Sequence, residues 1–191
     1  MKPIFSLTGL LAGLLLAGAV HADTYRFALL GDTPYSAYEK RELPKMLAAM
    51  QTAGAAFAVH IGDLKGGSES CSDALLQERH DLLDAAPLPL IYTPGDNEWQ
   101  DCSRVLAGHF DPDERLNHLR QLFFAQPRSL GSPSLPLEQQ PGDTRENTRW
   151  RLGPVLFLTI NQPGPDNRRG RNDVPPAEFL GRNRANLEWL K

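Results

Sequence analysis

Three stretches in the first hundred residues decide the fold: Phe-Ala-Leu-Leu-Gly-Asp at 27–32, Phe-Ala-Val-His-Ile-Gly-Asp at 57–63 and Leu-Pro-Leu-Ile-Tyr-Thr-Pro-Gly-Asp at 88–96. Each is a short apolar run closed by Gly-Asp, a pattern typical of a buried β-strand that ends in a turn. Successive acids lie 31 residues apart (32 to 63) and 33 residues apart (63 to 96), enough for a loop, a helix and the next strand. The repeat therefore predicts an α/β fold that begins with three parallel strands.

The acids that close these stretches are Asp32, Asp63 and Asp96. Because the carboxyl ends of parallel strands meet at one edge, where open α/β sheets place their ligands, we expect the three side chains to gather there. Two carboxylates ~4 Å apart repel by about 4 kcal/mol at an effective dielectric constant of ~20, so a cluster of three favours a bound cation. For any one pair taken alone, Gly-Asp is also ordinary turn and helix-capping chemistry, and that alternative remains open.

The first 22 residues predict a secretory signal peptide. Lys2 precedes an apolar stretch at 7–20, and cleavage is expected after Ala22, which leaves one domain at 23–191. The stretch is shorter than the roughly 20 residues that span a bilayer, so we expect no membrane anchor after cleavage and a secreted or periplasmic location. Without Lys2 the balance is 19 basic against 23 acidic residues, net −4. That balance argues against a nucleic-acid partner.

The chain has two cysteines, Cys71 and Cys102, and both lie in the part expected to be exported. In an oxidising compartment two such cysteines predict a disulfide. Cys71 comes eight residues after Asp63, and Cys102 comes six after Asp96. The bridge would therefore join the loops that follow the second and third strands. Two free thiols are the alternative.

Apolar residues at helical spacing predict further helices, and two β-prone runs around Gly153-Pro154 predict a hairpin. The expected elements are a helix from about Leu43 to Thr52, a helix capped by Ser72 that runs to about Asp84, a helix opened by Asp111-Pro112 that carries its apolar face to Phe123, a hairpin of 147–152 with 155–160, and a helix over 178–191. The start near Leu43 puts Pro44 in the first helical turn, where a missing N–H costs little. Residues 127–143, rich in Pro, Ser and Gly, are expected to form a loop.

The order Gly31-Asp32, Gly62-Asp63 and Gly95-Asp96-Asn97-Glu98 resembles the motifs of the calcineurin-like metallophosphoesterases. The resemblance covers roughly residues 25–161. It implies a two-sheet sandwich flanked by helices (α/β/β/α), with two divalent metal ions (Mn, Fe, Zn or Mg) at the strand ends. It further implies that Asp32 binds one ion, that Asp63 bridges both and that Asp96 binds the second. Asn97 would orient the substrate or transition state, and Glu98 would support the turn.

Two divalent ions about 3.5 to 4 Å apart lower the pKa of a bridging water and stabilise charge in an in-line displacement. The resemblance thus implies an exported phosphoesterase that hydrolyses a small phosphorylated substrate with a dinuclear-metal-activated hydroxide. Lys65, two residues after Asp63, could contact a phosphate, but we expect a solvated loop lysine. His60, three residues before Asp63, is expected to be a core residue whose hydrogen bonds are satisfied rather than a metal ligand.

The chain departs from the family pattern in its imidazoles. Pro34 stands where the family's Asp-x-His motif has His, Asn97 stands where the family has the His that assists the leaving group, and no Gly-His-x-His occurs. Asn can donate a hydrogen bond but cannot carry a proton at neutral pH. The missing motifs would lie beyond residue 191, so we expect a C-terminally truncated chain with an incomplete sandwich. The alternative function is a non-catalytic secreted module that binds metal or a phosphorylated ligand.

Overall fold

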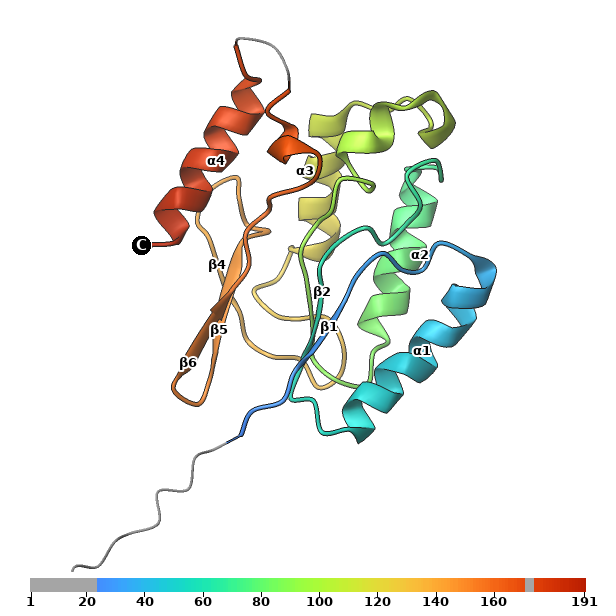
Figure 1. Cartoon of the computed structure of the whole chain (residues 1–191), viewed down its shortest axis with the longest axis vertical. Helices are drawn as coiled ribbons and strands as arrows, with labels where there is room; N and C mark the ends of the chain where they lie inside the picture. The colour runs from blue at the N-terminus through green and yellow to red at the C-terminus, as the bar shows by residue number, and fades with distance from the viewer. Residues whose placement is uncertain (1–23, 171–173) are drawn as a thin grey trace, which may run out of the picture.

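A computed structural model describes residues 24–170 and 174–191 of the chain (Figure 1). The expected signal peptide at 1–22 lies outside these residues. The elements are, in chain order, β1 (Ala28–Leu30), α1 (Ala37–Thr52), β2 (Ala58–His60), α2 (Asp73–Asp84), β3 (Leu90–Tyr92), two short 3-10 helices (Gln100–Ser103 and Val105–Ala107), α3 (Pro112–Phe123), β4 (Glu138–Gln139), β5 (Thr148–Leu152), β6 (Val155–Leu158), a third 3-10 helix (Asp166–Arg168) and α4 (Ala177–Trp189). The predicted mixture of helices and strands is confirmed.

The first sheet is parallel, with the strand order β1-β2-β3. Leu30 pairs with His60 and His60 pairs with Tyr92, so the three strands end side by side. Helices α1 and α2 make the two crossovers, as the intervals between the Gly-Asp pairs predict. The turns that follow the strands therefore share one edge of the sheet.

The parallel sheet has a different neighbour on each face because successive side chains of a strand point to opposite sides. On one face Ala58 and Leu90 belong to a core that includes Leu47 of α1, Leu83 of α2 and Leu119 of α3. Figure 1 shows α1 and α2 beside each other along this face of the sheet. The helices thus cover one side of the parallel sheet.

The second sheet covers the other face. Its order is β4-β5-β6 and all its pairings are antiparallel. Val59 and Ile91 of the parallel sheet, with Phe57 just before β2, form a second core with Trp150 of β5. The rings of Phe57 and Trp150 meet edge to face with centroids 5.3 Å apart, and Phe57 meets Phe157 of β6 at 5.0 Å. The two sheets therefore face each other across an aromatic layer.

Helix α1 begins earlier than the sequence predicts. It starts at Ala37 rather than near Leu43, so Pro44 lies inside the helix and not in its first turn. Ser36 caps the helix, with its hydroxyl accepting a hydrogen bond from the N–H of Glu39 at 3.2 Å. Ser-x-x-Glu is the capping-box sequence, and its contribution, with the burial of Leu43, outweighs the one intrahelical hydrogen bond that proline removes.

The other local predictions agree with the structure. The Ser72 hydroxyl caps α2, and the Asp111 carboxylate caps α3 by accepting from the N–H of Glu114 at 2.9 Å, with Pro112 at the first helical position. The hairpin of β5 and β6 turns at Gly153-Pro154. The expected loop at 127–143 is irregular apart from the two residues of β4. Within the described ranges, no helix reaches the length and apolarity that crossing a bilayer requires.

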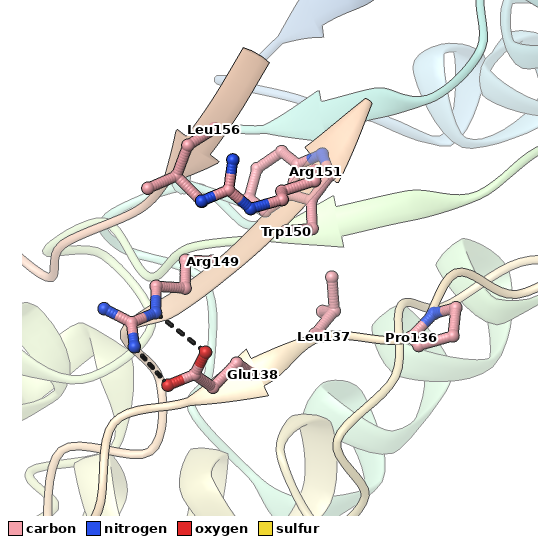
Figure 2. Close-up of a pocket in the computed structure, with 7 residues that line it drawn as sticks. All are labelled: Pro136, Leu137, Glu138, Arg149, Trp150, Arg151 and Leu156. Carbon is pink, nitrogen blue, oxygen red and sulfur yellow. Dashed lines mark hydrogen bonds and ion pairs between the residues drawn. The ribbon is translucent and has the colours of Figure 1, made fainter. Parts of the chain in front are cut away.

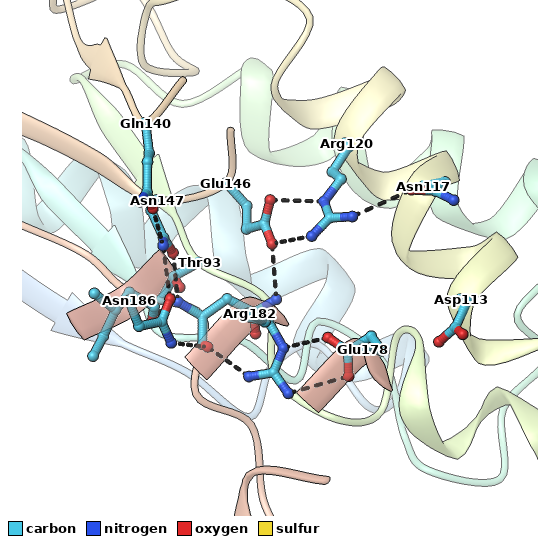
Figure 3. A network of polar contacts seen from close by, with 12 residues as sticks. Thr93, Asp113, Asn117, Arg120, Gln140, Glu146, Asn147, Glu178, Arg182 and Asn186 are labelled. Carbon is cyan, nitrogen blue, oxygen red and sulfur yellow. Dashed lines mark hydrogen bonds and ion pairs between the residues drawn. The ribbon is translucent and has the colours of Figure 1, made fainter. Parts of the chain in front are cut away.

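A buried polar network ties α4 to the second sheet and to α3 (Figure 3). Glu146, fully buried, accepts two hydrogen bonds from Arg120 of α3 at 2.7 and 2.8 Å. Asn147 donates to the side chain of Asn186 in α4 at 2.7 Å. Arg182 of α4 donates to the Asn161 carbonyl at 2.8 Å. Because buried charged and amide groups are costly unless paired, these contacts fix the position of α4.

The space between the sheets is open where β1 and β6 form their free edges. A groove of about 290 Å³ is lined by apolar side chains of both sheets. Leu29 is 61% exposed and Ile61 56% exposed on one side of this opening, and Leu158 of β6 is 37% exposed on the other. Phe27, 45% exposed, also lines this opening, while Phe57 and Trp150 behind it remain buried.

The disulfide between Cys71 and Cys102 is confirmed. Both cysteines are fully buried, and their Cα atoms lie 5.7 Å apart. The bridge joins the loop after β2 to the 3-10 helix after β3. It therefore joins the segments that follow two of the three Gly-Asp turns.

Replacing both cysteines, as Cys71→Ser with Cys102→Ser, should destabilise the chain by about 3 to 4 kcal/mol. The bridge spans 31 residues, and in the chain-entropy model opening a loop of this length releases that much unfolded-state entropy. Urea unfolding of the variant, of the oxidised wild type and of the wild type under reducing agent measures the effect. The reduced wild type should match the variant, and an unchanged midpoint in both would contradict the prediction.

Candidate functional site

The structure brings the three Gly-Asp turns together at the carboxyl edge of the parallel sheet. The N–H of Asp32 donates to the carbonyl of Gly62 at 3.2 Å, which joins the first turn to the second. The N–H of Asn97 donates to the carboxylate of Asp63 at 3.2 Å, which joins the third turn to the second. Asp63 is therefore the central acid of the three.

Two of the acids have an uncommon backbone conformation. The φ angles of Asp32 and Asp63 are 55° and 57°, in the left-handed region that only a few per cent of non-glycine residues adopt. Such residues persist where surrounding contacts over-determine them, and they cluster at functional sites. The same deviation at matching positions of two successive turns supports a shared role for these acids.

The second and third turns approach each other so closely that only glycine fits between them. A Cβ atom at Gly95 would lie 2.0 Å from a carboxylate oxygen of Asp63. A Cβ atom at Gly62 would lie 2.2 Å from the backbone nitrogen of Gly95, and Gly62 has a φ of 95°. The glycine of each Gly-Asp pair is therefore needed for the contact between the turns as well as for the turn itself.

The side chain of Glu98 binds the backbone of both of these turns. Its carboxylate is fully buried and accepts hydrogen bonds from the N–H of Asp63 at 3.1 Å, from the N–H of Gly95 at 2.8 Å and from the hydroxyl of Tyr92 at 2.6 Å. Burial raises the pKa of Glu98 to about 7, although the hydrogen bonds oppose the shift. The side chain faces the backbone of the turns, so it supports the site without lining it.

The acids act on one another electrostatically. The pKa of Asp63 is raised, first by burial and then by the negative charges of Asp96 and Asp32, while the N–H groups of the third turn oppose the shift. Within residues 24–170 and 174–191, no group of three or more His, Cys, Asp or Glu side chains is arranged to hold a metal ion. Carboxylate oxygens such as those of Asp32, Asp63 and Asp96 are nevertheless the type of ligand that hard divalent cations prefer, and a bound cation would relieve the repulsion at Asp63. The predicted dinuclear centre remains a prediction.

The environment of Asp96 extends the acidic site away from the sheet. A Cβ atom at Gly164, in the loop after β6, would lie 3.7 Å from a carboxylate oxygen of Asp96. The pKa of Asp101 is raised by burial and by the charge of Asp96, and Asp101 forms an ion pair with Arg104 at 2.6 Å. The sequence reading did not select Asp101, because it follows no predicted strand.

The expectation that Lys65 is a solvated loop residue is wrong. The residue is fully buried, and its ammonium group donates to the Gly66 carbonyl at 2.9 Å. Burial lowers the pKa of Lys65, and the charges of several carboxylates, Glu98 foremost, oppose the shift. Because its side chain is out of contact with solvent, Lys65 is not a surface contact for a phosphate.

His60 connects β2 to the first turn. Its ring is fully buried, with Nε2 placed 2.8 Å from the carbonyl of Thr33 and Nδ1 accepting from the N–H of Gly62 at 3.3 Å. Both ring nitrogens are therefore engaged, as in a core histidine, and the neutral ring donates through Nε2. Burial lowers the pKa of His60, while the Thr33 carbonyl and the charge of Asp32 oppose the shift.

Tyr35 is a further residue of this edge that sequence reasoning missed. Its hydroxyl donates to a carboxylate oxygen of Asp32 at 3.0 Å and accepts from the side-chain amide of Asn97 at 3.3 Å. The capping-box sequence from Ser36 to Glu39 is the signal that could have located it, since it places Tyr35 immediately before a helix at the end of the first turn.

A separate hollow lies against the second sheet. It has a volume of about 540 Å³ and is lined by residues 136–138, 149–151 and 156 (Figure 2). Arg149 and Glu138 form an ion pair across it, with Nε and Oε2 2.9 Å apart. None of the acids of the Gly-Asp turns lines this hollow. The candidate site is therefore the strand-end edge, where the turns meet, rather than this hollow.

Gly95→Ala should destabilise the chain by about 1 to 3 kcal/mol, because the added methyl group would overlap the carboxylate of Asp63 and force the two turns apart. Gly66→Ala is the matched control, since a Cβ atom there has no neighbour within 4 Å. Urea unfolding of both variants measures the difference. Equal stability of the two would contradict the close approach of the turns.

His60 should make stability fall on mild acidification. Its pKa is about 6.5 in the unfolded chain and lower in the folded one, so the unfolded state binds more protons. The stabilisation from the neutral ring is complete above pH ~6.5 and decreases below it, by up to about 1.4 kcal/mol per pH unit, until the folded-state pKa is reached. Melting temperatures between about pH 7 and pH 5 should fall more steeply for the wild type than for His60→Gln.

His109→Gln is the control for this prediction, because His109 is an exposed histidine. Its melting temperature should follow pH as that of the wild type does. Parallel curves for the wild type and His60→Gln would show that His60 does not cause the dependence.

Comparison with models of protein families, with characterised proteins and with solved structures gives no significant match. The resemblance to the calcineurin-like metallophosphoesterases therefore rests on the three Gly-Asp motifs of the sequence. Any function has to be argued from the geometry of the strand-end edge.

Proposed function

We propose that the chain is an exported, metal-dependent phosphoesterase of the calcineurin-like type that hydrolyses a small phosphorylated substrate. The observation that carries the proposal is the position of Asp63. Its carboxylate lies where the three turns meet, it is half-buried, and its pKa is raised in part by the charges of Asp96 and Asp32. Unpaired like charges at one strand-end edge are the arrangement that a divalent cation stabilises.

Asp32, Asp63 and Asp96 are the residues that would hold the metal ions. When bound, divalent ions supply positive charge for the phosphoryl oxygens and lower the pKa of water. The backbone N–H of Asn97 already orients the carboxylate of Asp63, and Glu98 fixes the peptide groups of the second and third turns. These contacts hold the backbone of the second and third turns in place. The acidic side chains would reorient to enclose an ion, since no three of them in the described residues are arranged to hold one.

Asn97 is the residue that we assign to the substrate. One hydrogen of its side-chain amide is used by Tyr35, and an amide nitrogen has two. The second hydrogen is available for a phosphoryl oxygen.

The arrangement of the two sheets also supports the resemblance. They face each other, and helices cover the outer face of the parallel sheet, as in the α/β/β/α sandwich that the resemblance implies.

A second candidate is a non-catalytic module that binds metal or a phosphorylated ligand. The observation that favours it is the engagement of His60. This imidazole near the turns has both nitrogens occupied by Thr33 and Gly62. His60 would then be unavailable to protonate the leaving group, a contribution that is worth about 10²-fold or more in rate.

The test is turnover of p-nitrophenyl phosphate and bis(p-nitrophenyl) phosphate in the presence of Mn²⁺, with Asp63→Asn as the variant. Because Asn keeps the shape but removes the charge at the centre of the site, we expect turnover to fall by about 100-fold or more. Asp143→Asn, at an exposed loop position, is the control and should retain wild-type turnover.

Three outcomes separate the candidates. Wild-type turnover that is lost in Asp63→Asn supports the enzyme. Calorimetric binding of Mn²⁺ without turnover of either ester favours the module. Turnover that is equal in Asp63→Asn and Asp143→Asn would contradict the site assignment.

A further inference from the structure

Tyr35 joins two turns through its side chain alone. The hydroxyl donates to Asp32 of the first turn at 3.0 Å and accepts from Asn97 of the third turn at 3.3 Å. Tyr35 and Asn97 are 62 positions apart in the sequence. These two hydrogen bonds link the first turn to the third.

The backbone of Tyr35 is held firmly on both sides. On one side its N–H donates to the Glu39 carboxylate at 2.5 Å, within the cap that starts α1. On the other side His60 donates to the Thr33 carbonyl at 2.8 Å. The position of the phenol is therefore set by the end of the first turn and by the start of the helix, before any ligand binds.

The phenol of Tyr35 has polar neighbours and is not packed in a hydrophobic core. Tyr35 is 40% exposed, and the contacts of its hydroxyl are polar. Burial, and then the charge of Asp63, raise the pKa of the phenol. By contrast, Tyr38, in the first turn of α1, is 65% exposed and has the guanidinium of Arg41 over its ring at 5.9 Å. The hydroxyl of Tyr35 thus lies beside the assigned acids, on a side chain that is partly exposed.

We propose that Tyr35 is a positioning residue of the phosphoesterase site, an inference that rests on the proposed function. By donating to one carboxylate oxygen of Asp32, the phenol leaves the other oxygen for a cation. By accepting one amide hydrogen of Asn97, it directs the other toward a phosphoryl oxygen. The phenol therefore aligns the cation-binding group of the first turn with the substrate-binding group of the third.

Tyr35→Phe tests this role, because it keeps the ring and removes only the hydroxyl. Tyr38→Phe, three residues further along in the first turn of α1, is the matched control. We expect Tyr35→Phe to lower kcat on p-nitrophenyl phosphate by about 10-fold, the effect of one lost hydrogen bond in the transition state, with little change in KM. It should also weaken Mn²⁺ binding, measured by calorimetry, by about 10-fold, while Tyr38→Phe changes neither.

A double variant separates positioning from a merely structural effect. If Tyr35 acts through Asn97, then Tyr35→Phe in an Asn97→Ala background should lower kcat less than it does in the wild type, since the amide that it orients is gone. Melting temperatures of the single variants should stay close to that of the wild type. A loss of kcat that merely follows a loss of folded protein would overturn the proposal.

The proposal and the proposed function can fail separately. Wild-type turnover with unchanged kcat and Mn²⁺ affinity in Tyr35→Phe would overturn the role of Tyr35 and leave the phosphoesterase intact. If the wild type binds Mn²⁺ but turns over neither ester, the proposed function fails and Mn²⁺ affinity alone tests Tyr35. Weaker binding by Tyr35→Phe than by the wild type would then support its positioning role, and equal binding would overturn it. A wild type that neither binds Mn²⁺ nor turns over an ester would overturn both.

Discussion

A fully buried carboxylate, that of Glu98, holds two of the three Gly-Asp turns in place. It accepts hydrogen bonds from the N–H groups of Asp63 and Gly95 and from the hydroxyl of Tyr92. A carboxylate removed from water is costly unless its oxygens are paired, and here the donors come from β3 and from the turns after β2 and β3. Any movement of one turn would leave part of this carboxylate unpaired, so the turns are coupled.

The coupling explains the features around Asp63. The two turns lie close enough to require glycine at positions 62 and 95, and Asp63 adopts a left-handed backbone. Its side chain then lies against the N–H of Asn97 and within the field of two other acids. The disulfide, which joins the segments that follow these two turns, adds to the same constraint. The proposed chemistry depends on this rigid arrangement of charge.

The first turn is held by different means. Neutral His60 donates to its backbone, and the cap of α1 fixes Tyr35 at its end. Its side-chain link to the third turn is the phenol that lies between Asp32 and Asn97. The site thus combines a second and a third turn that Glu98 holds together with a first turn that is joined to the second by a backbone hydrogen bond and to the third by one phenol hydroxyl. Tyr35, which is partly exposed at the end of the first turn, therefore lies beside the two turns that the buried Glu98 holds.

Much of the fold could be predicted from the sequence because its signals are local. Apolar runs closed by Gly-Asp predicted the parallel strands, Ser72 and Asp111 marked helix starts, and the two cysteines paired as expected. The same motifs selected Asp32 and Asp63, whose turns the structure joins by a hydrogen bond. In each case the information is contained in a few neighbouring residues or in the spacing between them.

What the sequence determined by itself is therefore the order of the α-helices and of the longer strands, the bridge, and the acids at the strand ends. Only the tertiary structure decided that Lys65 is buried, that Pro44 lies inside a helix, and that Tyr35 reaches Asn97. These outcomes depend on the packing of segments far apart in the chain. Burial and side-chain contact are properties of that packing, and no local pattern of residues carries them.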